Sequence, residues 1–358
     1  MTRLEAFQSA LRDAGAPCAL ISSEINQRYL SGFSFSDGYI LVTQNEGILL
    51  TDSRYIEAAR KEARDFTVIS SSGSMLEALK KLIIDLQTKE IAIEEDELSC
   101  STLKKLSGML SGVEINFGAS EILRSLRAIK TDNEIEKIAE AQALTDAAFT
   151  HILDFLSPRR TEKEVALELE FFMRKNGAEG VAFDTIAVSG CASSLPHGVP
   201  SDLQLRPGFL TMDFGARVDG YCSDMTRTVA IGRADEEMRR VYDTVLRAQT
   251  AALSVIRGGI SCYDADRAAR DVIREAGYGA NFGHSLGHGV GMFIHEAPSL
   301  SPKADTTSVL APGNVVTVEP GIYIEGRFGC RIEDMVAIKQ DGSLYNFTKS
   351  KKELIEII

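Results

Sequence analysis

Two segments of this sequence set carboxylates inside apolar runs that otherwise have the character of buried strands. LTMDFGARVDG at 210–220 and VTVEPGIYIEG at 316–326 match in residue type at most positions, and each is later followed by an acidic residue and the tripeptide VAI. The fourth position of both copies is acidic, Asp213 in the first and Glu319 in the second. Because strands disfavour Asp and Glu, this repeat predicts two related hairpins that face one another and present acids to a shared centre.

The first copy predicts a hairpin that turns at Asp219-Gly220, a dipeptide favoured in two-residue turns. Such a turn places residue 213 opposite 226 and residue 215 opposite 224. Because strand side chains alternate between faces, the carboxylates at 213 and 224 project from the same face and lie diagonally across the hairpin. They are then close enough to bind neighbouring metal ions.

The second copy adds Glu319 in VVTVEPGIYI and Glu333 in CRIEDMVAI, both within runs that have the character of buried strands. Four carboxylates in buried strands would repel one another and lose hydration, a cost that hydrogen bonds alone would struggle to offset. Divalent cations resolve this conflict. The alternative is that some acids pair with Arg227 or Arg331, or face solvent on a half-exposed sheet. It explains one acid as well as a metal does, but all four together much less well.

Histidines are concentrated near the second copy, since three of the five, His284, His288 and His295, fall within FGHSLGHGVGMFIHEAP. The glycines of this segment let the backbone approach a ligand or another strand closely. Residues 288 and 295 are seven apart and point to opposite faces of a regular strand, so a bulge, or placement on either side of a substrate, is needed if both serve one site. We interpret His284 as a structural histidine. His197, in the Pro- and Gly-rich loop SSLPHGVP, could equally be a surface residue.

The whole sequence predicts an α+β chain of two domains, since 358 residues exceed what one hydrophobic core usually supports. From residue 15 to about 125, short apolar runs such as CALISS and GILLTD alternate with helical stretches, which is typical of a small α/β domain. A long helix follows, because Thr131 and Glu134 have the spacing of a capping box. We therefore place the domains at 1–127 and 128–358.

Composition narrows the partners and the location. Lys and Arg total 39 against 51 Asp and Glu, a formal charge of −12, which argues against nucleic acid and anionic membranes as partners. The first fifteen residues have the pattern of an amphipathic helix rather than of a signal peptide, and no apolar run has transmembrane length. The six cysteines form no C-x-x-C pair, so we expect reduced thiols and a cytoplasmic location.

Four motifs, MDFGARVDGYCSDMTRT, GHGVGMFIHEAP, TVEPGIY and RIED, occur in this order, with two aspartates eleven residues apart and two glutamates fourteen apart. Together they resemble the pita-bread metallopeptidases, the family of prolidase, aminopeptidase P and methionine aminopeptidase. RYLSGF and LLTDSRY look like the accessory domain of the prolidase and aminopeptidase P branch, so the resemblance covers nearly the whole chain. It implies a creatinase/prolidase-type N-terminal domain and a pita-bread catalytic domain with internal pseudo-two-fold symmetry.

Matched position by position, this resemblance implies two divalent metal ions per chain. Asp213 would bind one ion, His288 and Glu319 would bind the other, and Asp224 and Glu333 would bridge the pair. Ligands that are all nitrogen or oxygen suit Mn, Co or Zn. The resemblance favours Mn or Co, with Zn as the alternative.

The same resemblance implies hydrolysis of the bond between an N-terminal residue and a following proline. Glu319 would move a proton from the attacking water towards the leaving nitrogen. His197 and His295 would contact the substrate and stabilise charge on the carbonyl oxygen. Arg331 and Tyr221 are candidates for supporting these groups, although packing or surface ion pairs explain them equally well. We expect proline-containing dipeptides or short peptides as substrates and a homodimer as the assembly.

Other members of this family leave alternatives open. Prolidase cleaves dipeptides, whereas aminopeptidase P also accepts longer peptides, and the modest N-terminal domain favours the prolidase-like arrangement. Methionine aminopeptidase fits less well because it lacks the accessory domain. Some relatives have lost their metals and act as binding modules or hydrolyse creatine, but they replace one or more of the five ligands that are all present here. A zincin site is excluded, because His295-Glu296 is not followed by the second histidine of H-E-x-x-H.

Overall fold

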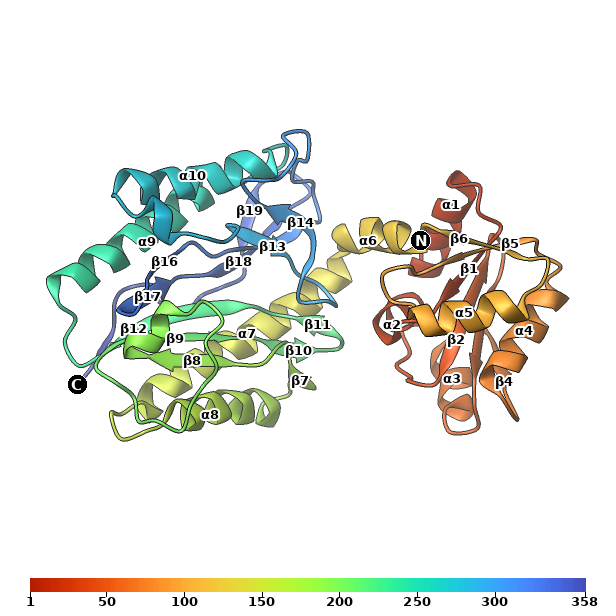
Figure 1. Cartoon of the computed structure of the whole chain (residues 1–358), viewed down its shortest axis with the longest axis horizontal. Helices are drawn as coiled ribbons and strands as arrows, with labels where there is room; N and C mark the ends of the chain where they lie inside the picture. Colours follow the sequence, from red (N-terminus) through yellow and green to blue (C-terminus); the bar gives the residue numbers. More distant parts are fainter. The chain divides into compact units, whose positions relative to one another are not determined.

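The computed structural model describes residues 1–358, and internal contacts divide the chain into two compact units, Met1–Leu126 and Arg127–Ile358. The first unit is a sheet with helices packed on it, and the second is a larger unit of helices and several small sheets (Figure 1). The mixture of helices and sheets confirms the predicted α+β class. We propose that these two units are the two domains expected from the sequence.

The N-terminal unit is built on one six-stranded mixed sheet. Its strands are β1 (Cys18–Ile21), β2 (Gly38–Thr43), β3 (Gly47–Thr51), β4 (Thr67–Ser70), β5 (Glu90–Ile93) and β6 (Glu114–Phe117). Its helices are α1 (Arg3–Asp13), α2 (Glu24–Ser31), α3 (Ile56–Glu62), α4 (Met75–Asp85), α5 (Cys100–Met109) and α6 (Ala119–Ala128), of which α6 continues into the second unit. The strand order is β4-β3-β2-β1-β5-β6, with β2 antiparallel to both neighbours and the outer strands parallel.

The first helix of this unit follows the amphipathic pattern of the sequence. A capping box formed by Thr2 and Glu5 begins α1, and its inner face buries Leu4, Phe7 and Leu11. Ala14 has the spacing of the same face but is exposed, because the helix ends at Asp13. The sheet and the helices α4 and α5 enclose a separate apolar cluster of the N-terminal unit.

The second unit contains two helix pairs and the strands that carry the acidic repeat. Its helices are α7 (Asp132–Phe155), α8 (Glu162–Lys175), α9 (Glu236–Val255) and α10 (Cys262–Glu275), with short 3-10 helices η1 (Gly190–Ser194) and η2 (Gly279–Asn281). Its strands are β7 (Gly180–Val181), β8 (Ile186–Ser189), β9 (Gly208–Phe214), β10 (Ala216–Val218), β11 (Tyr221–Cys222), β12 (Met225–Ile231), β13 (Gly287–Gly289), β14 (Glu296–Leu300), β15 (Val315–Val318), β16 (Gly321–Ile324), β17 (Phe328–Arg331), β18 (Asp334–Ile338), β19 (Leu344–Asn346) and β20 (Glu356–Ile357).

The two halves of this unit repeat one order of elements, a helix pair followed by an interrupted hairpin. The pair α7 and α8 precedes the hairpin of β9 to β12, and the pair α9 and α10 precedes the hairpin of β15 to β18. The helix pairs lie on opposite sides of the strands (Figure 1). Each pair buries its own apolar cluster against one hairpin, with Phe149 and Phe214 in the first cluster and Val241 and Val318 in the second. The internal repeat expected from the sequence is therefore a repeat of structure.

The first hairpin has the register that the sequence predicts. Asp213 pairs with Thr226, and Val218 pairs with Tyr221 across the Asp219-Gly220 turn. Both turn residues have positive φ, 47° and 84°, as a type I′ turn requires. Because the pairs on both sides share one register, residue 215 lies opposite 224, as expected.

The placement of three acids inside strands was wrong. Asp224 lies between β11 and β12, Glu319 between β15 and β16, and Glu333 between β17 and β18, whereas Asp213 is within β9. At these breaks the backbone bonds to other segments: the Glu319 N–H donates to the Leu286 carbonyl at 2.8 Å, and the Glu333 N–H donates to the Thr226 carbonyl at 3.1 Å. The breaks let the acids leave the plane of the ladder without losing backbone hydrogen bonds.

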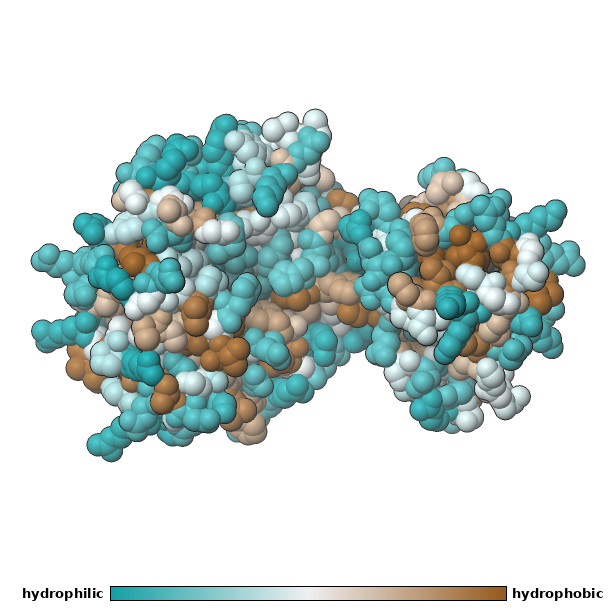
Figure 2. Space-filling view, in the orientation of Figure 1, coloured by the Kyte–Doolittle hydropathy of each residue, from teal (hydrophilic) through white to brown (hydrophobic).

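The surface of the second unit is largely polar on the face drawn in Figure 2, where hydrophobic residues form small separate groups. This agrees with the excess of acidic residues over basic ones. All six cysteines are free thiols, as expected from their spacing. None of the helices combines the length and the apolar character needed to cross a bilayer.

Candidate functional site

A cavity of about 590 Å³ in the second unit brings most of the predicted site residues together. Its walls include the five predicted metal ligands and three further predicted residues: Asp213, Asp224, His288, Glu319, Glu333, His197, His295 and Arg331. Apolar side chains complete the wall, among them Phe183, Ile186, Val199 and Ile294. Tyr221 does not line it. The combination of an apolar wall with a few convergent polar groups is typical of a ligand site.

Each hairpin contributes two acids to this cavity: Asp213 lies within β9, whereas Asp224, Glu319 and Glu333 lie at the breaks in the ladders. The first contributes Asp213 and Asp224 from the diagonal positions that the register predicts. In the second hairpin the strand pairs on both sides of the break share one register, which places Glu319 opposite Glu333. The two hairpins therefore bring four carboxylates from two distant segments to one cavity.

His288 reaches the acids from β13. Its backbone N–H donates to Thr317 Oγ1 at 3.1 Å, and its Nδ1 lies 3.1 Å from the Gly289 carbonyl oxygen. Because a carbonyl only accepts, this contact assigns the proton to Nδ1 and leaves Nε2 as a ligand atom. Nε2 lies 3.5 Å from Asp224 Oδ2 and 3.4 Å from Glu319 Oε1.

The segment after His288 contains the bulge that the sequence requires if both histidines serve one site. The register of β13 against β14 shifts between His288 and Gly289. As a result the imidazole of His295 lies against that of His288, with ring centroids 4.4 Å apart. Both rings border the same cavity.

The acidic cluster holds two buried oxygens, Asp213 Oδ1 and Glu333 Oε1, that have no hydrogen-bond partner. Their sister oxygens are bonded, Asp213 Oδ2 to Arg331 Nη2 at 2.6 Å and Glu333 Oε2 to Thr226 Oγ1 at 2.7 Å. Ligand atoms of Asp224, His288 and Glu333 all lie within 4.8 Å of one another. Orphaned buried carboxylate oxygens are costly in a protein alone, and together with a free imidazole nitrogen they fit divalent cations.

The carboxylates of this cluster repel one another when no cation is bound. Burial, followed by the charge of Glu333, raises the pKa of Asp224 well above its usual value, and burial with Glu319 does the same to the pKa of Glu333. Burial raises the pKa of Glu319 to about 8. Burial lowers the pKa of His288, so this imidazole is neutral and able to bind a metal near neutral pH.

These shifts predict how the stability of the metal-free protein depends on pH. A carboxyl whose pKa is raised in the folded state, as for Glu319 from 4.5 to about 8, stabilises the fold below its unfolded pKa, and this contribution is lost as the pH rises through the folded pKa. The buried histidines, whose pKa values are lowered in the folded state, make the stability rise with pH. This rise ends near their unfolded pKa of about 6.5. We therefore expect the Tm of the metal-free protein to fall between about pH 7 and pH 8.

Differential scanning calorimetry of chelator-treated protein measures this trend, with metal-loaded protein as the control. Because cations bind the ionised carboxylates, the gain in Tm on metal addition should grow over the same interval. A Tm of the metal-free protein that is constant or rises from about pH 7 to pH 8 would contradict the raised pKa of the acids.

The alternative in which arginines neutralise the acids holds for Asp213 alone. Arg331 is buried, binds Asp213, and donates to Tyr323 Oη at 2.7 Å and to Thr226 Oγ1 at 2.9 Å. Arg331 thus orients Asp213, which fits its proposed role of supporting the metal-binding and catalytic groups. Tyr221 has a different setting, since its hydroxyl donates to Glu134 Oε1 at 2.8 Å.

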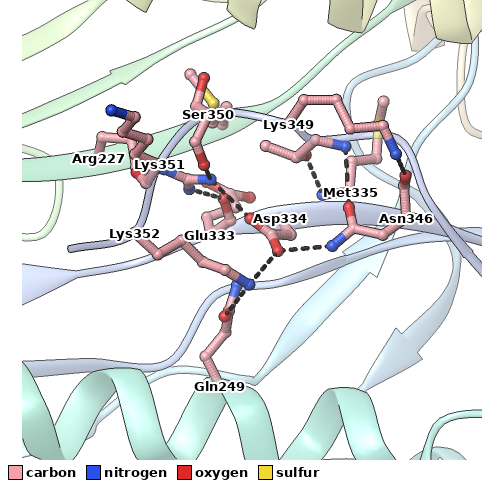
Figure 3. A network of polar contacts seen from close by, with 12 residues as sticks. Arg227, Gln249, Glu333, Asp334, Met335, Asn346, Lys349, Ser350, Lys351 and Lys352 are labelled. Carbon is pink, nitrogen blue, oxygen red and sulfur yellow. Dashed lines mark hydrogen bonds and ion pairs between the residues drawn. The ribbon is translucent and has the colours of Figure 1, made fainter.

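Arg227 pairs with the carboxylate of Asp334 instead of with the carboxylate of a predicted ligand, in a buried network beside the cluster (Figure 3). Its Nη2 donates to Asp334 Oδ1 at 2.8 Å, and its Nη1 donates to the Glu333 carbonyl. The other Asp334 oxygen accepts from Lys352 Nζ at 2.7 Å and from Asn346 Nδ2 at 2.8 Å. Sequence reasoning missed this network, although an acid directly after Glu333 in an apolar run was a signal for it.

His284 also lines the cavity, and its contacts favour the structural interpretation. Its Nδ1 lies 2.8 Å from the Ser285 carbonyl oxygen, and its Nε2 lies 3.1 Å from Tyr323 Oη. Burial, reinforced by the charge of Arg331, lowers the pKa of His284 to about 4. A neutral ring with both nitrogens occupied is suited to holding Tyr323 and Arg331 in place. The sequence offered no signal for the part that Tyr323 has in this contact.

Comparison with known proteins relates each unit to a protein family. Residues 136–340 match the model of metallopeptidase family M24, and residues 3–129 match the creatinase/prolidase N-terminal domain. The uncharacterized peptidase YqhT of Bacillus subtilis is 40% identical over 354 residues, which are 99% of this chain and 99% of that protein.

Two solved structures resemble the whole chain. A structure described as an Xaa-Pro dipeptidase from Bacillus anthracis has a TM-score of 0.95 and 42% identity, and covers 99% of both chains. An X-Pro aminopeptidase from Thermotoga maritima MSB8 has a TM-score of 0.90 and 40% identity, covering 98% of this chain and 100% of that one. The resemblance to the pita-bread metallopeptidases is therefore confirmed in sequence and in fold. The chain is a hydrolase that belongs to metallopeptidase family M24, with a creatinase/prolidase-type N-terminal domain.

Proposed function

We propose that this protein is a dinuclear-metal peptidase that hydrolyses the bond between an N-terminal residue and a following proline in short peptides. The observation that carries the proposal is the convergence of four carboxylates and the His288 imidazole on one cavity, with two buried carboxylate oxygens left without partners. The Xaa-Pro dipeptidase and the X-Pro aminopeptidase that share this fold support the choice of bond.

In this proposal the ligands divide between two cations. Asp213 would hold one ion, His288 and Glu319 would hold the other, and Asp224 and Glu333 would be shared between them. Two bound cations would supply Lewis acidity and would lower the pKa of water towards neutrality. We expect Mn or Co in the site, with Zn as the alternative, because the ligand set contains no thiolate that would select a softer metal.

Glu319 is the proposed proton carrier. Its carboxyl accepts a hydrogen bond from Thr317 Oγ1 at 3.1 Å, which orients it towards the cavity beside His288. Its pKa of about 8 applies to the metal-free protein, and bound cations would favour the ionised carboxylate, which is the form that can accept a proton. It would take this proton from the attacking water and give it to the proline nitrogen as the peptide bond breaks.

His295 and His197, the two histidines proposed to contact the substrate, differ in their surroundings. Burial, followed by the nearby His288, lowers the pKa of His295, so its neutral ring can donate one hydrogen bond to the carbonyl oxygen as negative charge develops there. His197 is exposed on the loop between η1 and β9 and lines the same cavity. The apolar wall formed by Phe183, Ile186 and Ile294 would exclude water from the bound peptide.

The proposal is tested with metal-stripped protein that is refilled with Mn, Co or Zn and given Ala-Pro and Ala-Pro-Ala. We expect hydrolysis only after metal is restored. Cleavage of the dipeptide alone would identify a prolidase-like dipeptidase, which the modest N-terminal unit favours, and cleavage of the tripeptide would identify an aminopeptidase P. Peptide binding without turnover under all metals would identify the metal-free binding module and overturn the enzymatic proposal.

A homodimer and a cytoplasmic location accompany this proposal as predictions from the sequence. Light scattering of the purified protein tests the dimer, and cell fractionation tests the location. Neither prediction is needed for the chemistry of the cavity described above, since the residues that form it all belong to the second unit.

A further inference from the structure

One buried carboxylate joins both ends of the loop that carries His197. Glu162 is the first residue of α8 and is only 3% exposed. Its Oε1 accepts from the Ser189 N–H at 2.7 Å and from Ser189 Oγ at 2.9 Å. Its Oε2 accepts from the Ser201 N–H at 3.0 Å and from Ser201 Oγ at 2.7 Å. Ser189 and Ser201 are the two ends of the segment that contains η1 and His197.

The four donors to Glu162 are all neutral groups at the two ends of the loop. Hydrogen bonds to a charged acceptor are stronger than bonds between neutral groups, and four of them occupy both oxygens. The position at the start of α8 adds the favourable partial charge of a helix N-terminus. A buried group of this kind fixes the donors around it, because any displacement leaves a charge without partners.

Within this segment η1 is also held, because Ser193 is 1% exposed and its Oγ accepts from the Gly329 N–H at 3.0 Å. The part that follows, residues 195–200, has few hydrogen bonds of its own. The Gly198 N–H donates to the Leu195 carbonyl at 3.1 Å, and the Pro196 carbonyl accepts from Arg331 Nη1 at 3.3 Å. Val199 is 84% exposed, and His197 is also exposed, yet both line the cavity. The His197 ring therefore lies between the anchor at Ser193 and the end of the loop that Glu162 holds at Ser201.

We propose that Glu162 is a positioning residue, which acts through His197 by holding residues 189 and 201 in place. This inference rests on the proposed function, because it assumes that His197 contacts the substrate. Misplacement of a substrate-contacting group by about 1 Å can cost about a hundredfold in rate. A residue that never touches the peptide can thus control turnover.

The test uses the variant Glu162→Gln in the full-length, metal-loaded protein. Gln has the size of Glu, but its amide nitrogen is a donor and would face the N–H of Ser189 or Ser201. We expect kcat/KM on the better of Ala-Pro and Ala-Pro-Ala to fall by about tenfold to a hundredfold. Glu164→Gln is the matched control, since Glu164 lies in the same helix turn but bonds to Thr161 and not to the loop.

A double-mutant cycle with His197→Ala separates positioning from general destabilisation. If Glu162 acts through His197, Glu162→Gln should change kcat/KM by less than about twofold once the imidazole is absent. The same loss in both backgrounds would overturn the proposal and assign Glu162 a structural role. Glu164→Gln should leave kcat/KM within about twofold in either background.

Hydrogen exchange tests the contact itself without any activity. The amides of the 189–201 segment should exchange faster in Glu162→Gln than in the wild type, while Glu164→Gln should leave them unchanged. Unchanged exchange in Glu162→Gln would overturn the proposed contact. If the wild type cleaves neither peptide, the proposed function fails and with it the role of His197, whereas faster exchange would still establish that Glu162 holds the loop.

Discussion

The Glu319→Gln variant is expected to lose turnover almost completely, with kcat reduced by about a thousandfold. Gln keeps the size of the side chain and can still accept the hydrogen bond from Thr317, but it cannot take up a proton and carries no charge for a cation. Steady-state hydrolysis of Ala-Pro and Ala-Pro-Ala, with saturating metal, measures this loss. Metal content by mass spectrometry on the same samples separates a lost proton carrier from a lost ligand.

Glu325→Gln provides the control, because Glu325 is exposed at the end of the same hairpin, between β16 and β17. This variant should retain wild-type kcat and metal content. Turnover in Glu319→Gln within about tenfold of the wild type would remove Glu319 from the proposed proton transfer. If the Glu319→Gln variant binds one ion fewer but keeps a normal rate, Glu319 binds a metal ion that the reaction does not need.

Asp334→Asn is expected to cause the largest loss of stability, about 3–5 kcal/mol in the free energy of unfolding. Arg227 and Asp334 are both almost completely buried, and the carboxylate also accepts from Lys352 and Asn346 (Figure 3). Burial alone would raise the pKa of Asp334, but Arg227 and Lys352 hold it below its usual value. Replacing this carboxylate by an amide leaves a buried guanidinium without its counter-charge and puts donors opposite donors.

Urea unfolding of metal-free protein, followed by circular dichroism, measures the change, and Asp243→Asn on the exposed face of α9 is the matched control. The control should stay within about 0.5 kcal/mol of the wild type. A loss below about 1 kcal/mol for Asp334→Asn would show that the pair adds little to stability. Arg227 also binds the Glu333 carbonyl, so we expect weaker metal binding in the same variant.

The parts of the fold that depend on neighbouring residues could be predicted from the sequence. The Asp219-Gly220 turn sets the register of the first hairpin, because only a few dipeptides adopt two successive positive φ values. The helix that begins after Thr131 has the expected capping box with Glu134. The spacing of His288 and His295 predicts that a backbone bulge is needed if both are to serve one site. The structure has this bulge after His288, and the two rings lie against each other.

Contacts between distant segments could not be predicted in this way. The breaks at Glu319 and Glu333 exist because Leu286 and Thr226, which are far away in sequence, supply backbone acceptors. Likewise Glu162 bonds to residues 27 and 39 positions later. The periodicity of α8 places it on the buried face with Val165 and Leu169, but does not identify these partners. Such pairs follow from the packing of helix pairs on hairpins, which pattern and propensity do not specify.

The division of the acids between two hairpins has a consequence for biosynthesis. During translation the first hairpin emerges with Asp213 and Asp224 long before the second, since Thr226 and its bonding partner Glu333 are separated by 107 positions. β20 later pairs with Ala230 and Ile231, at the end of β12 that lies farther from Asp224. In the proposed site, a cation would therefore find its full ligand set only after Glu333 has been synthesised and the second hairpin has folded. A polypeptide truncated before Glu333 is expected to bind the ions weakly.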